Sequence, residues 1–98
     1  MIVQLSNSEF EDPQSDMNIK IKADFIYVRV GANMFTWGCE AGEDDDGNTG
    51  IIVYSSPGVR YDEGPQQGQA IGEIVRNQAV SVLKEVAVKQ GFFLDLAR

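Results

Sequence analysis

Short apolar segments separated by polar loops make up residues 1–61, a pattern typical of a β-sheet. The clearest segment is residues 18–30, where apolar and charged side chains alternate strictly up to Phe25. The alternation is lost after Phe25, which indicates a β-bulge or a strand end that is buried on both faces. Further strands are predicted at residues 1–5, 34–40, 51–55 and 59–61, with a tight turn at residues 31–33.

The hydrophobic period changes to that of an α-helix in residues 65–90, where apolar side chains recur at intervals of three and four. Lys89 suits the last turn, and Gly91 predicts the helix end. This order predicts an α+β fold, an antiparallel sheet of about four or five strands with one long C-terminal helix packed on one face. Residues 1–98 are expected to form a single domain. The helix positions expected to pack against the sheet are Ile71, Ile74, Val75, Val82, Leu83 and Val86.

Composition excludes several kinds of chemistry. The chain has no histidine and one cysteine, Cys39. A Ser-His-Asp or Cys-His nucleophile and a His-ligated zinc site are therefore excluded, and Cys39 cannot form an internal disulfide. No segment approaches the roughly 20 apolar residues that a membrane helix needs. We therefore expect a soluble, cytoplasmic, non-enzymatic protein that has no cofactor, binds no metal and makes no contact with a membrane.

Acidic residues are concentrated in two segments of a chain whose net charge is −7. Residues 1–16 contain four acids and residues 40–46 contain five, and neither segment contains a base. An acidic protein repels phosphates, so we expect no direct binding to nucleic acid. The acidic segments either meet a basic surface on another protein or are solvated loops that keep the chain soluble.

The acidic run at residues 44–48 is similar to part of a calcium-binding loop. Calcium requires oxygen ligands at alternate positions and a distal bidentate glutamate. Gly42 and Val53 stand where the first acid and that glutamate are required. A hairpin turn at residues 46–47 therefore explains the run better than a metal site.

Apolar side chains occupy both faces of the predicted strands. Phe35, Trp37 and Cys39 share one face of their strand. In residues 25–30, Phe25 and Tyr27 lie on one face, and the apolar residues between and after them lie on the other. A single helix covers only one face of a sheet. The other face is covered either by the terminal segments of the chain itself or by a partner molecule.

These features lead to two hypotheses of function. The first is a small acidic protein-binding module, an inhibitor or adaptor of the phage or mobile-element type, which acts on a basic or nucleic-acid-binding protein. The alternative is a self-associating structural subunit, such as a homodimer or a phage particle component. The predicted partner-binding residues are the acids of one loop and two aromatic residues expected to be exposed: Glu43, Asp44, Asp45, Asp46, Trp37 and Tyr61.

Overall fold

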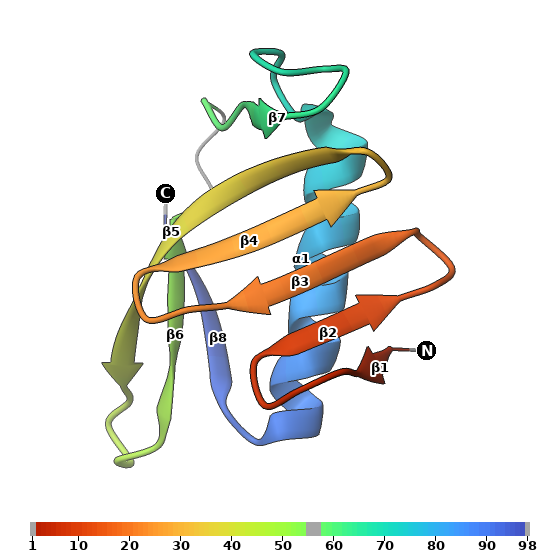
Figure 1. Ribbon diagram of the computed structural model, residues 1–98. Coiled ribbons are helices and arrows are strands. Elements are labelled where there is room, and N and C mark those ends of the chain that lie inside the picture. The colour runs from red at the N-terminus through yellow and green to blue at the C-terminus, as the bar shows by residue number, and fades with distance from the viewer. Residues whose placement is uncertain (1, 55–57, 98) are drawn as a thin grey trace.

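The computed structural model describes residues 2–54 and 58–97, and this part of the chain forms eight strands and one helix (Figure 1). The strands are β1 (Val3–Gln4), β2 (Glu9–Asp12), β3 (Met17–Ile21), β4 (Phe25–Val30), β5 (Asn33–Glu43), β6 (Thr49–Tyr54), β7 (Tyr61–Glu63) and β8 (Phe93–Ala97). The helix α1 (Gly72–Gln90) lies between β7 and β8 in the chain. The α+β class and the C-terminal position of the helix agree with the sequence. The predicted strand ends at residues 1 and 55 lie outside the described residues.

The sheet is larger than predicted and is mixed rather than antiparallel. Its strand order is β1-β2-β3-β4-β5-β6-β8, with β7 paired to β5. All neighbours are antiparallel except β6 and β8, which are parallel. Two strands occur where the sequence pattern predicted none. Strand β2 has a single apolar residue, Phe10, which is too few to produce an alternating pattern. Strand β8 is formed by the short segment that follows the helix end.

The segment predicted as one strand, residues 18–30, is instead the hairpin of β3 and β4. The chain turns at residues 22–24, where the Lys22 backbone N–H donates to the Phe25 carbonyl oxygen at 2.8 Å. No glycine or proline marks this turn, so only the loss of alternation after Phe25 indicated it. The change of phase therefore reflects a reversal of the chain, and neither a bulge nor a strand end buried on both faces explains it.

The helix begins later than its predicted start at residue 65. Residues 64–67 form a turn, closed by a hydrogen bond from the Gln67 N–H to the Gly64 carbonyl at 3.1 Å. The predicted end is confirmed: Gly91 has a φ of 78° and its N–H donates to the Ala87 carbonyl at 2.9 Å. Ile74 is 76% exposed, contrary to the expectation that it packs against the sheet.

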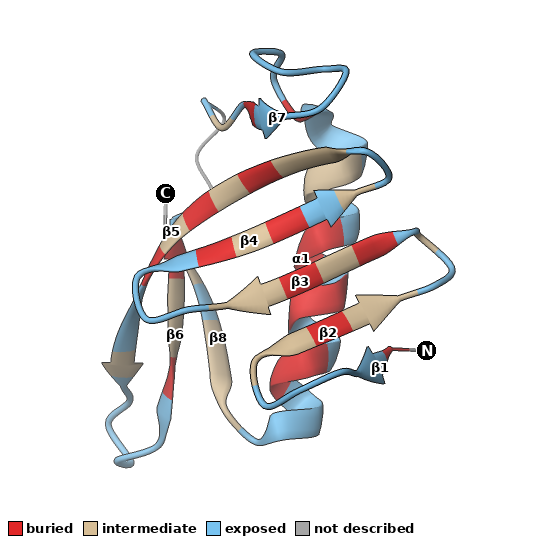
Figure 2. Cartoon of the chain, viewed as in Figure 1, coloured by how far each residue is buried: buried red, intermediate tan, exposed pale blue. Residues whose placement is uncertain are grey.

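The sheet curls around the helix (Figure 1). Alternate residues of the strands are buried on the side that the helix occupies. We call this side the inner face. Its residues share one core cluster with the buried side of α1, and Figure 2 shows the resulting alternation of burial along β3, β4 and β5. The core includes the inner-face residues Phe10, Met17, Ile19, Ile26, Val28, Phe35, Trp37, Cys39 and Val53 and the helix residues Ala79, Val80, Val82, Leu83 and Val86.

The terminal segments extend the sheet instead of folding across its second side, which we call the outer face. Near the N-terminus, β1 pairs with β2, and the Ile2 N–H donates to Glu85 Oε2 at 3.2 Å. Near the C-terminus, β8 pairs with β6. In the part of the chain that the structure describes, no element lies over the outer face of β3, β4 and β5, which is turned toward the viewer in Figure 1.

Candidate functional site

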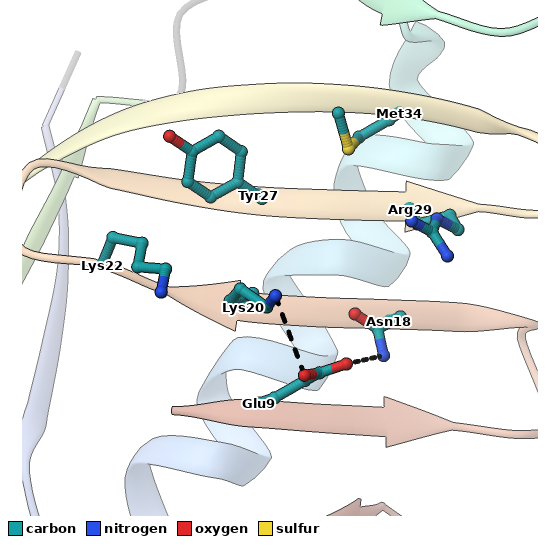
Figure 3. A pocket seen from close by; sticks show the side chains of 7 residues that line it. All are labelled: Glu9, Asn18, Lys20, Lys22, Tyr27, Arg29 and Met34. Atoms are coloured by element: carbon teal, nitrogen blue, oxygen red, sulfur yellow. Dashed lines mark hydrogen bonds and ion pairs between the residues drawn. The ribbon is translucent and has the colours of Figure 1, made fainter. Parts of the chain in front are cut away.

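An open pocket with a volume of about 340 Å³ lies on the outer face of β2, β3, β4 and β5 (Figure 3). We call it the outer-face pocket. It is large enough to take a small ligand or one or two side chains of a partner. Its lining residues are Glu9, Asn18, Lys20, Lys22, Tyr27, Arg29 and Met34.

The register of the strands brings these residues together. Lys20 is paired with Glu9 on one side and with Tyr27 on the other. Arg29 is paired with Met34 on the next strand. Directly paired residues of neighbouring strands have their side chains on the same face, about 5 Å apart at Cβ. The pocket is therefore a product of the pairing of four strands.

Positive charge predominates in the outer-face pocket, although the whole chain is acidic. Glu9 is the only carboxylate in the lining; it accepts a hydrogen bond from Asn18 Nδ2 at 2.9 Å and lies 3.9 Å from Lys20 Nζ. Within the described residues, Lys22 and Arg29 form no ion pair. The pocket thus holds three cations against one carboxylate, and that carboxylate already has two partners.

Aromatic side chains continue the outer face beyond the pocket. The rings of Phe25 and Tyr27 are 6.5 Å apart between centroids, and Phe25 is 48% exposed. Tyr54, 44% exposed, lies on β6 across Gly38 from Phe25. A hydrogen bond to the Glu40 carboxylate raises the pKa of the Tyr54 hydroxyl. The outer face therefore combines exposed aromatic rings with cations over the four neighbouring strands β3 to β6.

The four predicted acids lie together at the tip of the β5–β6 hairpin, and all are exposed. We call Glu43, Asp44, Asp45 and Asp46 the hairpin tip. Asp44 stabilises the turn: its Oδ1 accepts hydrogen bonds from the N–H groups of Asp46 at 3.0 Å and Asn48 at 2.8 Å. These bonds, the one from Asn48 first, lower the pKa of Asp44. The hairpin predicted here is present, but its loop is residues 44–48 and not a two-residue turn at 46–47: the Gly47 N–H donates to the Asp44 carbonyl at 3.0 Å, and Gly47 has a φ of 83°.

The two predicted aromatic residues are not exposed. Trp37 is 0% exposed and Tyr61 is 5% exposed, and both lie on the inner side of the sheet. Their rings pack edge-on against Phe35, at centroid distances of 5.2 Å and 5.9 Å. The expectation that both are exposed is therefore wrong, because their rings are part of the core between the sheet and the helix. The structure does not bring them together with the hairpin tip.

Cys39, the single cysteine of the chain, lies in the core. Cys39 is buried, and this burial, with a smaller effect from Asp24, raises the pKa of its thiol. A raised pKa reduces the reactive thiolate. Among the residues that the structure describes, no three Cys, Asp or Glu side chains come together as a metal site would require. No helix in the same residues is long and apolar enough to cross a membrane.

Sequence reasoning missed the outer-face pocket. The signal that existed was the polar half of the alternation, in which Lys20 and Lys22 occupy the positions between the apolar residues Ile19, Ile21 and Ala23. Its connection to Tyr27 and Arg29 depends on the turn at residues 22–24. The loss of alternation that marks this turn was interpreted as a bulge or a buried strand end. Comparison of the chain with protein-family models, curated proteins and solved structures finds no match.

Proposed function

We propose that the protein is a small, non-enzymatic protein-binding module, an inhibitor or adaptor, and that the outer face of its sheet is the binding surface. One observation supports this proposal: the outer face has no covering element among the described residues and combines exposed Phe25 and Tyr54 with Tyr27, Met34 and Arg29. Tyr, Phe, Met and Arg are the residue types enriched at protein interfaces.

The chemistry of the outer-face pocket favours binding over catalysis. A general acid or base needs a titratable group within reach of a substrate and with a pKa suited to proton transfer. Glu9 is held by Asn18 and Lys20, and no second carboxylate, histidine or thiol lines the pocket. The pocket is better suited to holding charged and apolar groups in place.

The hairpin tip is negatively charged, in contrast to the positively charged outer-face pocket, and so offers a second place of contact with a partner. Exposed carboxylates on a loop mainly accelerate the encounter with a basic surface, because long-range attraction acts before contact. We propose that the tip guides a partner with a basic or nucleic-acid-binding surface toward this module. A role of this kind suits the inhibitors and adaptors that phages and mobile elements encode.

The proposal is tested by affinity capture from a lysate of the cells in which the protein is made, with three baits. The wild-type chain is compared with an outer-face variant, Tyr27→Ala combined with Arg29→Glu, and with a tip variant, Asp45→Lys combined with Asp46→Lys. We expect the wild type and the tip variant to retain the same dominant protein and the outer-face variant to lose it. Retention by the outer-face variant would contradict the proposal.

The alternative function is a self-associating subunit that uses the same uncovered face. Light scattering distinguishes it from a module that binds a different protein, because it measures the oligomeric state. A monomer at micromolar concentration agrees with a module that binds a different protein. A dimer or ring that dissociates in the Tyr27→Ala, Arg29→Glu variant would favour the structural subunit instead. Circular dichroism of both variants checks that they keep the fold, so that a loss of binding reports on the surface.

A further inference from the structure

The cations of the outer-face pocket are arranged in a row. Lys20 lies on β3, and Lys22 directly follows the last residue of that strand, where its N–H donates to the Phe25 carbonyl. Extended backbone spacing over two residues places their Cα atoms about 7 Å apart. Arg29 is paired with Asn18, one further step of two residues along the same direction. Figure 3 shows Lys22 and Arg29 at opposite ends of the pocket, with Lys20 between them.

This row stands out in a chain with 15 acidic and 8 basic residues. A protein with an excess of carboxylates can readily place one beside each exposed cation, as Glu9 beside Lys20 shows. Lys22 and Arg29 have no such carboxylate within the described residues. The pocket is therefore electrostatically complementary to an anionic ligand rather than to the rest of its own surface.

Apart from Arg29, the side of the pocket opposite Lys20 and Lys22 is formed by two largely apolar side chains. Tyr27 and Met34, from β4 and β5, are both half-buried and present an aromatic ring and a thioether to the pocket (Figure 3). A methionine side chain adapts to many apolar shapes, and a tyrosine ring offers a flat surface. The ligand should therefore present apolar groups alongside its negative charges.

We infer that the outer-face pocket binds an extended acidic segment of a partner protein, in which acidic residues alternate with apolar ones; the inference rests on the proposed function. In an extended chain, side chains on one edge repeat every two residues, about 7 Å, which matches the spacing of the cation row. Carboxylates of the segment contact Lys22, Lys20 and Arg29, and its apolar side chains contact Tyr27 and Met34.

An extended acidic segment fits better than a single-stranded nucleic acid, which also offers charges and flat apolar groups. A nucleic acid carries a charge at every nucleotide, so its charges continue beyond the pocket. There they would meet Glu11 on β2 and Asp62 and Glu63 on β7, which lie at the two edges of this region. A short peptide can place its charges within the row alone.

The test is a fluorescence anisotropy titration of the full chain with three labelled probes. They are an eight-residue peptide of alternating glutamate and leucine, the same peptide with lysine in place of glutamate, and an eight-nucleotide oligothymidylate. We expect saturable binding of the glutamate peptide, weakened at least tenfold when salt is raised from 50 to 500 mM, because ion pairs at an open surface are screened. Equal or tighter binding of either other probe would overturn the inference.

A matched pair of variants locates the contact. Lys22→Glu with Arg29→Glu should weaken the glutamate peptide at least tenfold. Lys84→Glu with Lys89→Glu changes the net charge equally on exposed helix positions and should weaken it less than threefold. Equal losses would overturn the inference, because the effect would then come from net charge. Thermal melts of both variants confirm that each is folded.

The result is distinguishable from failure of the proposed function. If the glutamate peptide does not bind, but the captured protein still depends on Tyr27 and Arg29, the acidic-segment inference is wrong and the protein-binding module stands. If neither the peptide nor the captured protein depends on these residues, both proposals are wrong. NMR shifts of backbone amides in β3 and β4 on peptide addition would support both.

Discussion

The two faces of β3, β4 and β5 are made from alternate residues of the same segments, yet they have opposite properties. On the inner face, Val28, Phe35 and Trp37 are fully buried in the core. On the outer face, the residues that alternate with them include Tyr27 and Arg29, which line an open pocket. The difference shows that the inner face forms the core, while the outer face remains open to solvent.

The comparison of the two faces also explains why Trp37 and Tyr61 were wrongly expected to be exposed. Trp37 and Tyr61 are typical of binding surfaces, but they are equally typical of cores. Residue type alone could not decide between these roles. The position of each residue relative to the helix decides it, and the helix covers the side on which Trp37 and Tyr61 lie.

The strongest test of the comparison is truncation of one large residue on each face. Trp37→Ala should lower the free energy of unfolding by about 3–5 kcal/mol, because it removes a fully buried ring that packs on Phe35. Tyr27→Ala on the outer face should lower it by less than half as much. Chemical denaturation followed by circular dichroism measures both. Similar losses would mean that the two faces do not differ as described.

A conservative variant sharpens this test. Among the described residues, Trp37 Nε1 is buried without a hydrogen-bond partner. A buried donor without a partner costs about 1–3 kcal/mol. Trp37→Phe removes that donor and keeps most of the ring, so we expect a loss well below that of Trp37→Ala. A loss equal to that of alanine would show that the indole shape itself is required.

The next test compares two outer-face glycines. A Cβ at Gly50 would overlap the ring and the backbone oxygen of Phe93 on β8, whereas a Cβ at Gly38 would lie 3.8 Å from Tyr54 Cδ2. Gly50→Ala should therefore lower the free energy of unfolding by about 1–3 kcal/mol. It should also speed amide hydrogen exchange in β8. Gly38→Ala is the matched control and should leave both nearly unchanged; an equal effect there would contradict the assigned β6–β8 pairing.

A smaller effect concerns the thiol of Cys39 on the inner face. Because burial raises its pKa and blocks access, reaction with an aromatic disulfide reagent at pH 8 should be at least tenfold slower in the native protein than in the unfolded one. The rate is followed by absorbance, with the protein in urea as the reference. A native rate close to the unfolded rate would mean that the Cys39 thiol is accessible in the folded protein and is not buried between the sheet and the helix.

The smallest effect is at the hairpin tip, which belongs to neither face. The folded-state pKa of Asp44 lies below its unfolded value, so the ionised form stabilises the turn. This contribution is present above the unfolded pKa and is lost as the pH falls through the folded pKa. Asp44→Ala should therefore reduce stability near neutral pH and remove this part of the acid dependence. Asp45→Ala is the control.

An NMR titration of the Asp44 carboxyl carbon checks the direction of the shift. A midpoint above that of an unfolded peptide would contradict the turn geometry.

The turn geometry also determines which acids of the hairpin tip can be reversed in charge. Asp45 and Asp46 can be changed to lysine while Asp44 keeps its bonds to Asn48. A change in partner association would then report on charge and not on loss of the turn.

Several elements could be predicted from local pattern because local chemistry decides them. Gly91 ends the helix since a left-handed residue is needed there. The alternation of Phe35, Trp37 and Cys39 identified one face of β5, and the structure confirms that they lie together. Strand β2 could not be predicted, since its burial of Phe10 depends on pairing with β1 and β3.

By itself, the sequence determined the α+β class, the helix end, the two acidic segments and the absence of histidine chemistry, because composition and short-range periodicity are properties of the chain. Tertiary structure alone decided which face the helix covers and that the termini extend the sheet. It also decided that Lys20, Lys22 and Arg29 lie together with Tyr27. The physical reason is that a turn at residues 22–24 and the pairing of four strands set these distances. The loss of alternation after Phe25 marks the turn only ambiguously, and the pairing of the strands leaves no local signature in the side-chain pattern.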